Sequence, residues 1–316
     1  MKYRMGVDIG GTSIKAGLVD ENYNIIKKDS SGTPDTFEKS MKELADLIFR
    51  ITQDAGLTVN DLPCIGIGTP CSVIKGTGRL VFANNTGWKN VSITDELSKY
   101  ISIPIYAEND ANCAVTGEMI AGAARNRKNV VMITLGTGVG GGIIIDGKLY
   151  AGADGLGAEL GHTPLIFGGL QCTCGMPGCF ERYASATALV RQTSDAVAAH
   201  PESSMAAWVK EHGRVSGKTA FECAEDGDRT ALDVLDQYAS YIAGGLTGFT
   251  NIFRPELIII GGGISNAGEA LLGRVRDKVS SFLLGYDVVG GPEIVKAALG
   301  NDAGIIGASC LDRVRA

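Results

Sequence analysis

The stretch MGVDIGGTSIKAGLV, residues 5–19, decides how this chain folds. A short apolar run ends at Gly10 and Gly11, and a second apolar run begins at Ile14. We therefore expect a strand, a glycine turn and a second strand, with a third strand over residues 24–26. Because the turn joins two strands rather than a strand and a helix, it is neither a nucleotide P-loop nor a dinucleotide-binding fingerprint.

The same pattern returns in VVMITLGTGVGGGIII, residues 130–145, with a glycine turn between two apolar runs. Asp146 and Gly147 then give a strong signal for a tight hairpin, after which a third strand begins. We interpret the recurrence as an internal duplication, which predicts two related lobes that face each other across a cleft. The alternative is a chance resemblance between two hairpins.

Other segments alternate between helical and strand patterns, as expected for an α/β protein. Apolar residues at helical spacing predict a helix over residues 36–55 and a long helix from Leu232 to near Pro255. The tail from Ala303 to Val314 is rich in small residues and is expected to be a helix that returns to the first lobe. Short buried-type strands are predicted at residues 64–68, 104–107 and 257–260, and mostly helical structure at residues 183–224.

Composition narrows the class of protein. The 316 residues are 45% hydrophobic and 20% charged, with a formal net charge of −6, so non-specific binding of nucleic acid is not expected. No apolar run approaches the ~18 residues that span a bilayer, and the N-terminus does not resemble a signal peptide. Most of the eight cysteines look like reduced thiols of a cytoplasmic protein. The 44 glycines cluster beside apolar runs, which suggests backbone brought close to a ligand.

The two glycine turns are candidate phosphate-binding sites. Glycine lets backbone N–H groups approach phosphate oxygens, and a threonine hydroxyl adds a donor. Asp8 lies just before the first turn and is a candidate for holding hydrated Mg²⁺. A third glycine run follows a predicted buried strand and is a weaker candidate, because close packing also selects glycine. The alternative for each turn is a tight hairpin alone. The candidates are Gly10, Gly11 and Thr12 in the first turn, Gly136, Thr137 and Gly138 in the second, and Gly262 and Gly263 in the third.

Asn109 and Asp110 follow a predicted strand and open a helix. In phosphoryl transfer an acceptor is needed for the proton of the attacking hydroxyl, and Asp110 is the candidate for that general base. Asn109 is a candidate for holding neighbouring hydroxyls. The alternative is that these residues simply cap the helix.

One histidine and three thiols lie within 18 residues of one another: His162, Cys172, Cys174 and Cys179. Their types and spacing predict a structural Zn²⁺ site with all four positions filled by protein. Reduced thiols or a redox pair are the alternatives. Glu159 and Glu181 flank this segment and are candidates for accepting hydrogen bonds from sugar hydroxyls, unless they are solvated surface carboxylates.

With these residues assembled, the chain resembles the ROK family (repressors, open reading frames, kinases), and within it the bacterial glucokinases. The resemblance covers essentially the whole chain. It rests on DIGGT at residues 8–12, END at 108–110, LGTG at 135–138, ELGH at 159–162 and CTCGMPGCFE at 172–181.

The resemblance implies an actin-like ATPase fold of the sugar-kinase type, with a duplicated two-lobe α/β architecture closing over ATP, Mg²⁺ and a hexose. The expected lobes are residues 1–115 plus 300–316, and residues 116–299. By similarity Asp110 is the general base, the zinc ligands are His162, Cys172, Cys174 and Cys179, and the sugar is bound by Asn84, Asn109, Asp110, Glu159, His162 and Glu181. Ser13 stands where many members have lysine, and Lys15 comes two residues later, so a lysine–phosphate contact from this turn is not expected.

The expected activity is transfer of the ATP γ-phosphoryl group to the 6-hydroxyl of glucose, and the stretch ERYASAT at residues 181–187 favours glucose. Kinases for N-acetylmannosamine, N-acetylglucosamine, fructose, mannose or allose remain alternatives, as does a non-catalytic sugar-sensing member. Repressors of the family carry a DNA-binding module before the first turn, and with seven residues preceding Asp8 we expect none. A homodimer or homotetramer is expected from the resemblance.

Overall fold

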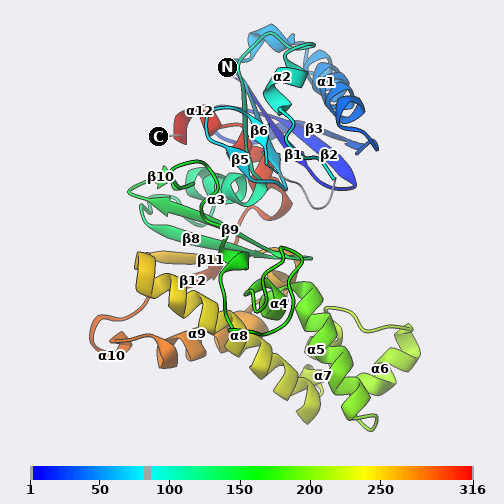
Figure 1. Ribbon diagram of the computed structural model, residues 1–316, viewed down its shortest axis with the longest axis vertical. Helices are drawn as coiled ribbons and strands as arrows, with labels where there is room; N and C mark the ends of the chain where they lie inside the picture. The colour runs from blue at the N-terminus through cyan, green and yellow to red at the C-terminus, as the bar shows by residue number, and fades with distance from the viewer. Residues whose placement is uncertain (1–2, 82–86, 315–316) are drawn as a thin grey trace. The chain divides into compact units, whose positions relative to one another are not determined.

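The computed structural model describes residues 3–81 and 87–314. The chain divides into two compact units (Figure 1). The first comprises Met1–Met132, Gly142–Ala158 and Ala298–Ala316, and the second comprises Ile133–Gly141 and Glu159–Ala297. Residues 298–314 therefore belong to the same unit as residues 3–81 and 87–132.

The first sheet has the order β3-β2-β1-β4-β7. β1 and β2 are antiparallel across the glycine turn, whereas β1, β4 and β7 are parallel. The apolar side chains of β1 and β4 are buried, which explains why these runs form central strands. The strands are β1 (Arg4–Ile9), β2 (Ser13–Val19), β3 (Ile25–Gly32), β4 (Ile65–Thr69) and β7 (Ile105–Asn109), with a separate pair β5 (Val73–Ile74) and β6 (Arg79–Leu80).

The second sheet repeats this arrangement with the order β10-β9-β8-β11-β12. Its first strand is again central, its next two strands extend one side, and β11 pairs in parallel with β12 on the other side. This equivalence confirms the predicted duplication. The strands are β8 (Val130–Leu135), β9 (Val139–Ile145), β10 (Lys148–Leu149), β11 (Leu257–Gly261) and β12 (Glu293–Lys296).

The strand β3 is longer than the sequence predicted, because it continues to Gly32. Its second half consists of polar residues, most of them exposed, that pair with β2 as the edge of the sheet. Edge strands need no apolar alternation, and charged side chains there discourage pairing with other chains. The hydrophobic pattern therefore marked only the start of this strand.

Helix α1 (Phe37–Asp54) covers the first sheet and matches the predicted helix. Thr36 caps its N-terminus by accepting the backbone N–H of Lys39 at 3.3 Å. Its buried side chains recur at helical spacing, with Met41, Leu44 and Ile48 fully buried. The same unit contains η1 (Val59–Asp61), α2 (Ile93–Leu97), α3 (Asp110–Ala121), η4 (Gly300–Asp302), α11 (Ala303–Ala308) and α12 (Leu311–Val314).

Helix α11 packs directly on the backbone of the first sheet and on α3. A Cβ on Gly6 would overlap the carbonyl oxygen of Ile305, and a Cβ on Gly66 would overlap that of Ala308. These strand glycines therefore bring a helix, not a ligand, close to the sheet. Part of the glycine excess that suggested ligand binding in the sequence has this structural origin.

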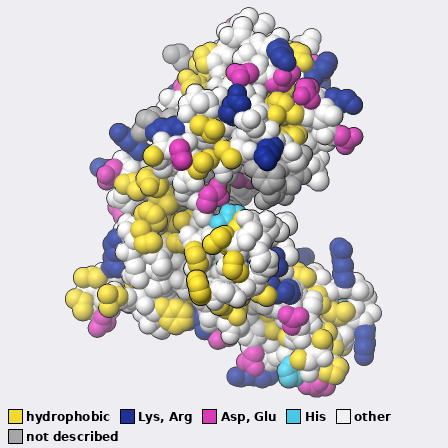
Figure 2. Space-filling view, in the orientation of Figure 1, with side chains coloured by type: hydrophobic (Ala, Val, Ile, Leu, Met, Phe, Trp, Pro, Cys, Tyr) yellow, Lys and Arg dark blue, Asp and Glu magenta, His cyan; other side chains and the backbone are white. Residues whose placement is uncertain are grey.

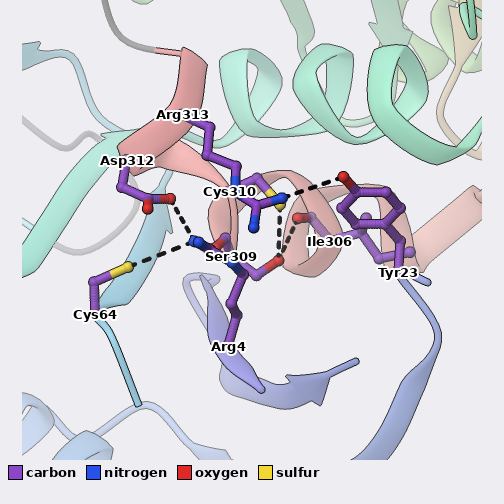
Figure 3. Close-up of polar contacts among 8 residues, drawn as sticks. All are labelled: Arg4, Tyr23, Cys64, Ile306, Ser309, Cys310, Asp312 and Arg313. Atoms are coloured by element: carbon purple, nitrogen blue, oxygen red, sulfur yellow. Dashed lines mark hydrogen bonds and ion pairs between the residues drawn. The ribbon is translucent and has the colours of Figure 1, made fainter. Parts of the chain in front are cut away.

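Polar contacts then fasten the chain's C-terminal segment to β1 (Figure 3). The Arg4 guanidinium lies 2.5 Å from the Asp312 carboxylate and donates to the Ser309 carbonyl oxygen at 3.3 Å. Arg313 donates to the hydroxyl of Tyr23 at 3.3 Å. This partly buried ion pair explains how a short terminal helix is held in a fixed position.

The second unit is mostly helical. The long helix α8 buries Tyr238, whose hydroxyl donates to the Ala184 carbonyl oxygen at 2.7 Å, and packs Phe249 edge-to-face on Phe180 at a centroid distance of 5.7 Å. The helices of the second unit are η2 (Leu160–His162), α4 (Glu181–Ala184), α5 (Ala186–Ala199), α6 (Ser204–His212), α7 (Thr219–Glu225), α8 (Arg229–Phe253), η3 (Gly263–Ala267), α9 (Glu269–Phe282) and α10 (Tyr286–Val289).

Two surface properties bear on partners. Among residues 3–81 and 87–314, every helix is too short or too polar to cross a bilayer. Apolar side chains gather on the surface over α10 (Figure 2), where Leu284, Val288 and Val289 are 70–85% exposed. Exposed apolar side chains in such a group are typical of interaction surfaces.

Candidate functional site

The first glycine turn joins β1 to β2 and is held by backbone contacts on its inner side. Gly10 donates its N–H to the Ser13 carbonyl oxygen at 2.8 Å, and the Thr33 hydroxyl donates to the Gly10 carbonyl oxygen at 2.8 Å. Gly11 and Thr12, at the tip, are exposed. The turn is therefore a rigid support whose tip is accessible to a ligand, and its role in binding phosphate stays a prediction.

Asp8 lies in β1 two residues before this turn. Its neighbours in register are Lys15 on β2 and Gly68 on β4, and α11 passes beside it at Gly304. Burial raises the pKa of the Asp8 carboxyl, while the positive charges of Lys15 and Lys28 oppose this change. A half-buried carboxylate at the end of a strand is a candidate site for a divalent cation. Lys15 thus faces Asp8 rather than standing in the turn itself.

Asn109 and Asp110 form the junction between β7 and α3. Asn109 caps the helix, because its Oδ1 accepts the N–H groups of Ala111 at 2.9 Å and Asn112 at 3.2 Å. Asn109 therefore caps the helix, which is compatible with its predicted contact to the sugar. Asp110 is the first helical residue, is half-buried, and accepts the Ala111 N–H at 2.7 Å.

Glu108, which is 5% exposed near the end of β7, has a structural role that was not predicted from the sequence. Its Oε1 accepts the Asn109 backbone N–H at 2.9 Å and the Asn112 side-chain amide at 3.1 Å. Glu108 therefore fixes the junction that carries Asp110. A carboxylate that directly follows the stretch Ile105–Ala107 within the same strand is the signal that marks it in the sequence.

The strand register brings these residues together at the carboxyl ends of the parallel strands of the first sheet. Asp8, Gly68 and Glu108 are aligned across three parallel strands, so the Cα atoms of Asp8 and Glu108 are about 10 Å apart. The carboxyl ends of parallel strands are where α/β proteins bind ligands. The first turn, Asp8 and Asp110 therefore form one contiguous candidate site in the first unit.

The second glycine turn, residues 136–138, joins β8 to β9 in the second unit. The Glu181 carboxylate accepts the Val139 N–H at 2.9 Å, and a Cβ on Gly138 would collide with that carboxylate. The absence of a side chain at Gly138 thus leaves room for the Glu181 carboxylate in the position that it occupies. This contact, which no sequence pattern indicated, joins a predicted sugar-binding residue to a predicted phosphate turn.

The predicted zinc ligands come together in the second unit. The ligand atoms of His162, Cys172, Cys174 and Cys179 all lie within 4.8 Å of one another. The sulfur atoms of Cys174 and Cys179 are 3.5 Å apart, and Cys172 Sγ lies 3.8 Å from His162 Nδ1. The edges of a tetrahedron around Zn²⁺ with sulfur and nitrogen ligands are about 3.6–3.8 Å long. The four residues therefore fit a closed tetrahedral site.

The thiols of this cluster influence one another's protonation. Burial raises the pKa of the Cys179 thiol to about 12, and hydrogen bonding with the neighbouring thiols adds to this effect. Burial also acts to raise the pKa of Cys174, but hydrogen bonds from the Met176 backbone and the other thiols outweigh it and lower the pKa. Metal binding to such a cluster would release protons, because the ligands are thiolates.

Two candidate sugar-binding residues adjoin this cluster: Glu181 Oε1 lies 3.8 Å from Cys172 Sγ, and the Glu159 carbonyl oxygen accepts the His162 N–H at 3.0 Å. Glu159 is exposed and directly precedes η2, whereas His162 ends η2 and is half-buried. A Cβ on Gly161 would overlap the carbonyl oxygen of Val139, so η2 packs closely on the start of β9. The second turn, the cysteine cluster and the candidate sugar residues of this unit are therefore neighbours.

The third glycine run leads from β11 into η3. Gly262 has a φ of 80°, and a Cβ there would overlap the Leu135 backbone, so this glycine serves close packing. Gly263 lines a cavity of about 360 Å³, which is large enough for a nucleoside. The other lining residues are Gly217, Lys218, Phe221, Glu222, Ile264, Asn266 and Ala267. Asn84 lies outside the described residues.

Comparisons with known proteins identify the family of the chain. Residues 4–314 match the ROK family. The chain is 41% identical to the glucokinase of Thermotoga maritima over 315 residues, which covers 98% of this chain and 97% of that protein. It is 37% identical to the glucokinase of Halalkalibacterium halodurans over 313 residues, covering 98% of this chain and 94% of that protein.

A solved structure gives the same result. The ROK family glucokinase of Streptomyces griseus, crystallised with glucose and AMPPNP, superposes with a TM-score of 0.84 at 36% identity and 98% coverage of both chains. The duplicated sheets are therefore those of the actin-like sugar-kinase fold. With its family pattern matched over almost its entire length, the chain belongs to the ROK family.

Proposed function

We propose that the chain is an ATP-dependent hexose kinase that phosphorylates the 6-hydroxyl of glucose. The observation that carries the proposal is the arrangement of Asp110, Asp8 and the first glycine turn at the carboxyl ends of the parallel strands of the first sheet. There a half-buried aspartate at a helix start, Asp110, shares the carboxyl ends of parallel strands with a glycine turn and Asp8. Phosphoryl transfer needs a proton acceptor, a phosphate support and a cation in such proximity.

In this mechanism Asp110 accepts the proton of the sugar 6-hydroxyl while the oxygen attacks the γ-phosphorus, and ADP leaves as the bond between the γ-phosphorus and the bridging β,γ-oxygen breaks. Glu108 and the cap formed by Asn109 fix the junction on which Asp110 stands. Asp8 would hold Mg²⁺ through water, and the cation would neutralise charge on the phosphates. Residues 10–12 supply backbone N–H groups and a hydroxyl to the phosphates.

The second unit carries its own candidate binding residues. In this proposal residues 136–138 bind phosphate. Hydrogen bonds with the sugar hydroxyls are assigned to Glu159, His162 and Glu181, and also to Asn109 and Asn84. The histidine and three thiols would hold a structural Zn²⁺, which would fix the orientation of the His162 ring. The cavity at Gly263 would take the nucleoside of ATP.

Glucose is the proposed substrate because the two relatives described above are glucokinases, and the S. griseus relative was crystallised with glucose. Other hexoses are the alternatives within the same chemistry. The exposed apolar group of Leu284, Val288 and Val289 supports the proposal of a homo-oligomer, which a light-scattering mass of the intact chain would test.

The test of the proposal is a coupled assay of ATP-dependent phosphorylation. The panel contains glucose, mannose, fructose, N-acetylglucosamine, N-acetylmannosamine and allose, and the product from glucose is identified by NMR. We expect glucose to give the highest kcat/KM and glucose 6-phosphate as product. Phosphorylation of another sugar alone would refute the choice of glucose, and phosphorylation of none would refute the kinase.

A further inference from the structure

The second glycine turn is held from one side by the start of helix α5. The Gly136 carbonyl oxygen accepts the backbone N–H of Ala186 at 2.8 Å. The Thr137 carbonyl oxygen accepts the hydroxyl of Thr187 at 2.8 Å. Two successive carbonyl groups of the turn therefore point toward α5.

Peptide geometry then fixes the direction of two donors. In a trans peptide the C=O and N–H groups point in opposite directions, and the group is planar. The Gly136 carbonyl belongs to the same peptide as the Thr137 N–H, and the Thr137 carbonyl to the same peptide as the Gly138 N–H. Both N–H groups therefore point away from α5.

The backbone N–H groups on either side of this pair, those of Gly136 and Val139, already have hydrogen-bond acceptors. Gly136 donates to the Gly138 carbonyl oxygen at 3.0 Å, and Val139 donates to Glu181 at 2.9 Å. Within residues 3–81 and 87–314, no protein group accepts the N–H of Thr137 or Gly138. The turn thus presents a pair of adjacent donors, as a phosphate-binding loop does.

We infer that Thr187 is a positioning residue for this turn, through the hydroxyl that orients the Thr137–Gly138 peptide. The inference rests on the proposed function, because it takes ATP phosphate as the group that the donors meet. Glycine residues on both sides of Thr137 make the peptide free to rotate when it is unsupported. A rotated peptide would turn a carbonyl oxygen toward the phosphates in place of an N–H.

Thr187 itself is well fixed for this task. It lies in the first turn of α5, whose N-terminus is capped by the Ser185 hydroxyl accepting the Ala188 N–H at 3.1 Å. Its side chain is exposed, so replacement by valine leaves the packing of α5 unchanged. The contact from Ala186 comes from the backbone, so the hydroxyl of Thr187 is the part of the support that a substitution removes.

The experiment compares Thr187→Val and Thr187→Ser with Thr193→Val as the matched control. Thr193 lies in the same helix and its hydroxyl makes a bond of the same length, 2.8 Å, to the Leu189 carbonyl oxygen. For Thr187→Val we expect the KM for ATP to rise about threefold to tenfold, the range given by losing one hydrogen bond. The KM for glucose of Thr187→Val should stay within about twofold of the wild-type value. Thr187→Ser keeps the hydroxyl, so its KM for ATP should stay close to that of the wild type. Thr193→Val should leave the KM for ATP unchanged.

Calorimetric titration with ADP and with adenosine separates orientation of the phosphates from general damage to the nucleotide site. We expect Thr187→Val to weaken ADP binding by a similar factor and to leave adenosine binding unchanged. Equal loss for both ligands, or unchanged ADP binding, would overturn the inference. A wild-type chain that phosphorylates no hexose would instead overturn the proposed function, and the titrations, which need no turnover, would still decide the role of Thr187.

Discussion

Replacing the proposed general base is the perturbation whose effects the structure separates most cleanly. Asp110 accepts the Ala111 N–H through Oδ1 at 2.7 Å, and the helix cap is provided by Asn109. Asparagine at position 110 keeps an Oδ1 that can accept the same N–H, so Asp110→Asn preserves the start of α3. What it removes is the negative charge near the helix N-terminus, worth about 0.3–1 kcal/mol of stability, and the proton acceptor.

The expected effect on catalysis is much larger than the effect on stability. Loss of a general base lowers kcat by about 10²–10⁴-fold, which corresponds to roughly 3–5 kcal/mol of transition-state stabilisation. The melting temperature should fall by no more than about 2–4 °C. The KM for glucose should change little, because the asparagine still offers hydrogen-bonding groups to the 6-hydroxyl.

The assay measures initial rates with ATP and glucose at saturating concentrations, alongside thermal unfolding of each variant. Asp95→Asn is the matched control, since it makes the same change at an exposed residue in the first turn of α2. The control should retain the wild-type kcat. A kcat for Asp110→Asn within about tenfold of wild type, with the protein folded, would refute the assignment of the base.

Three further predictions concern the cysteine cluster, the Asp8 carboxylate and the packing of α11. Zinc analysis should give one ion per chain, and Cys174→Ser should lose this ion whereas Cys223→Ser, outside the cluster, should retain it. Loss of the ion should weaken glucose binding in titrations. An unchanged affinity for glucose without metal would contradict the structural role of the ion. Because burial raises the pKa of Asp8, its ionised form destabilises the folded chain at any pH above the ordinary carboxyl pKa. In the absence of Mg²⁺ and nucleotide, Asp8→Asn should therefore raise the melting temperature near neutral pH. This gain in melting temperature should disappear as the pH falls toward about 4. A gain that grows on acidification would contradict the sign. Gly66→Ala should cost about 1–3 kcal/mol or more in urea unfolding because its Cβ meets helix backbone, whereas Gly32→Ala, with open space around it, should cost little; equal effects would show that α11 does not pack as described.

Patterns along the sequence predicted the parts of the fold that depend on local periodicity. The two hairpins, the helix after Thr36 and the long helix ending near Pro255 all lie where apolar spacing indicated. The duplication was also readable, because the same strand–turn–strand pattern occurs twice. The grouping of His162 with three thiols followed from residue type and spacing, since few other arrangements place these ligands so close in sequence.

Contacts between distant segments were not readable. Nothing near Gly66 in the sequence indicates that a helix formed by residues more than 200 positions later rests on it. The bond from Glu181 to Val139, and that from Thr187 to Thr137, likewise depend on how separate elements pack. Such contacts leave no periodic signal, because a single hydrogen bond constrains one residue at each end.

The measurement that tests the central claim most directly is a crystal structure of the protein with glucose and a non-hydrolysable ATP analogue. We expect the Asp110 carboxylate to lie within about 2.6–3.2 Å of the sugar 6-hydroxyl oxygen, with that oxygen facing the γ-phosphorus. A sugar bound with a different hydroxyl toward the phosphate, or with Asp110 out of hydrogen-bonding reach, would contradict it.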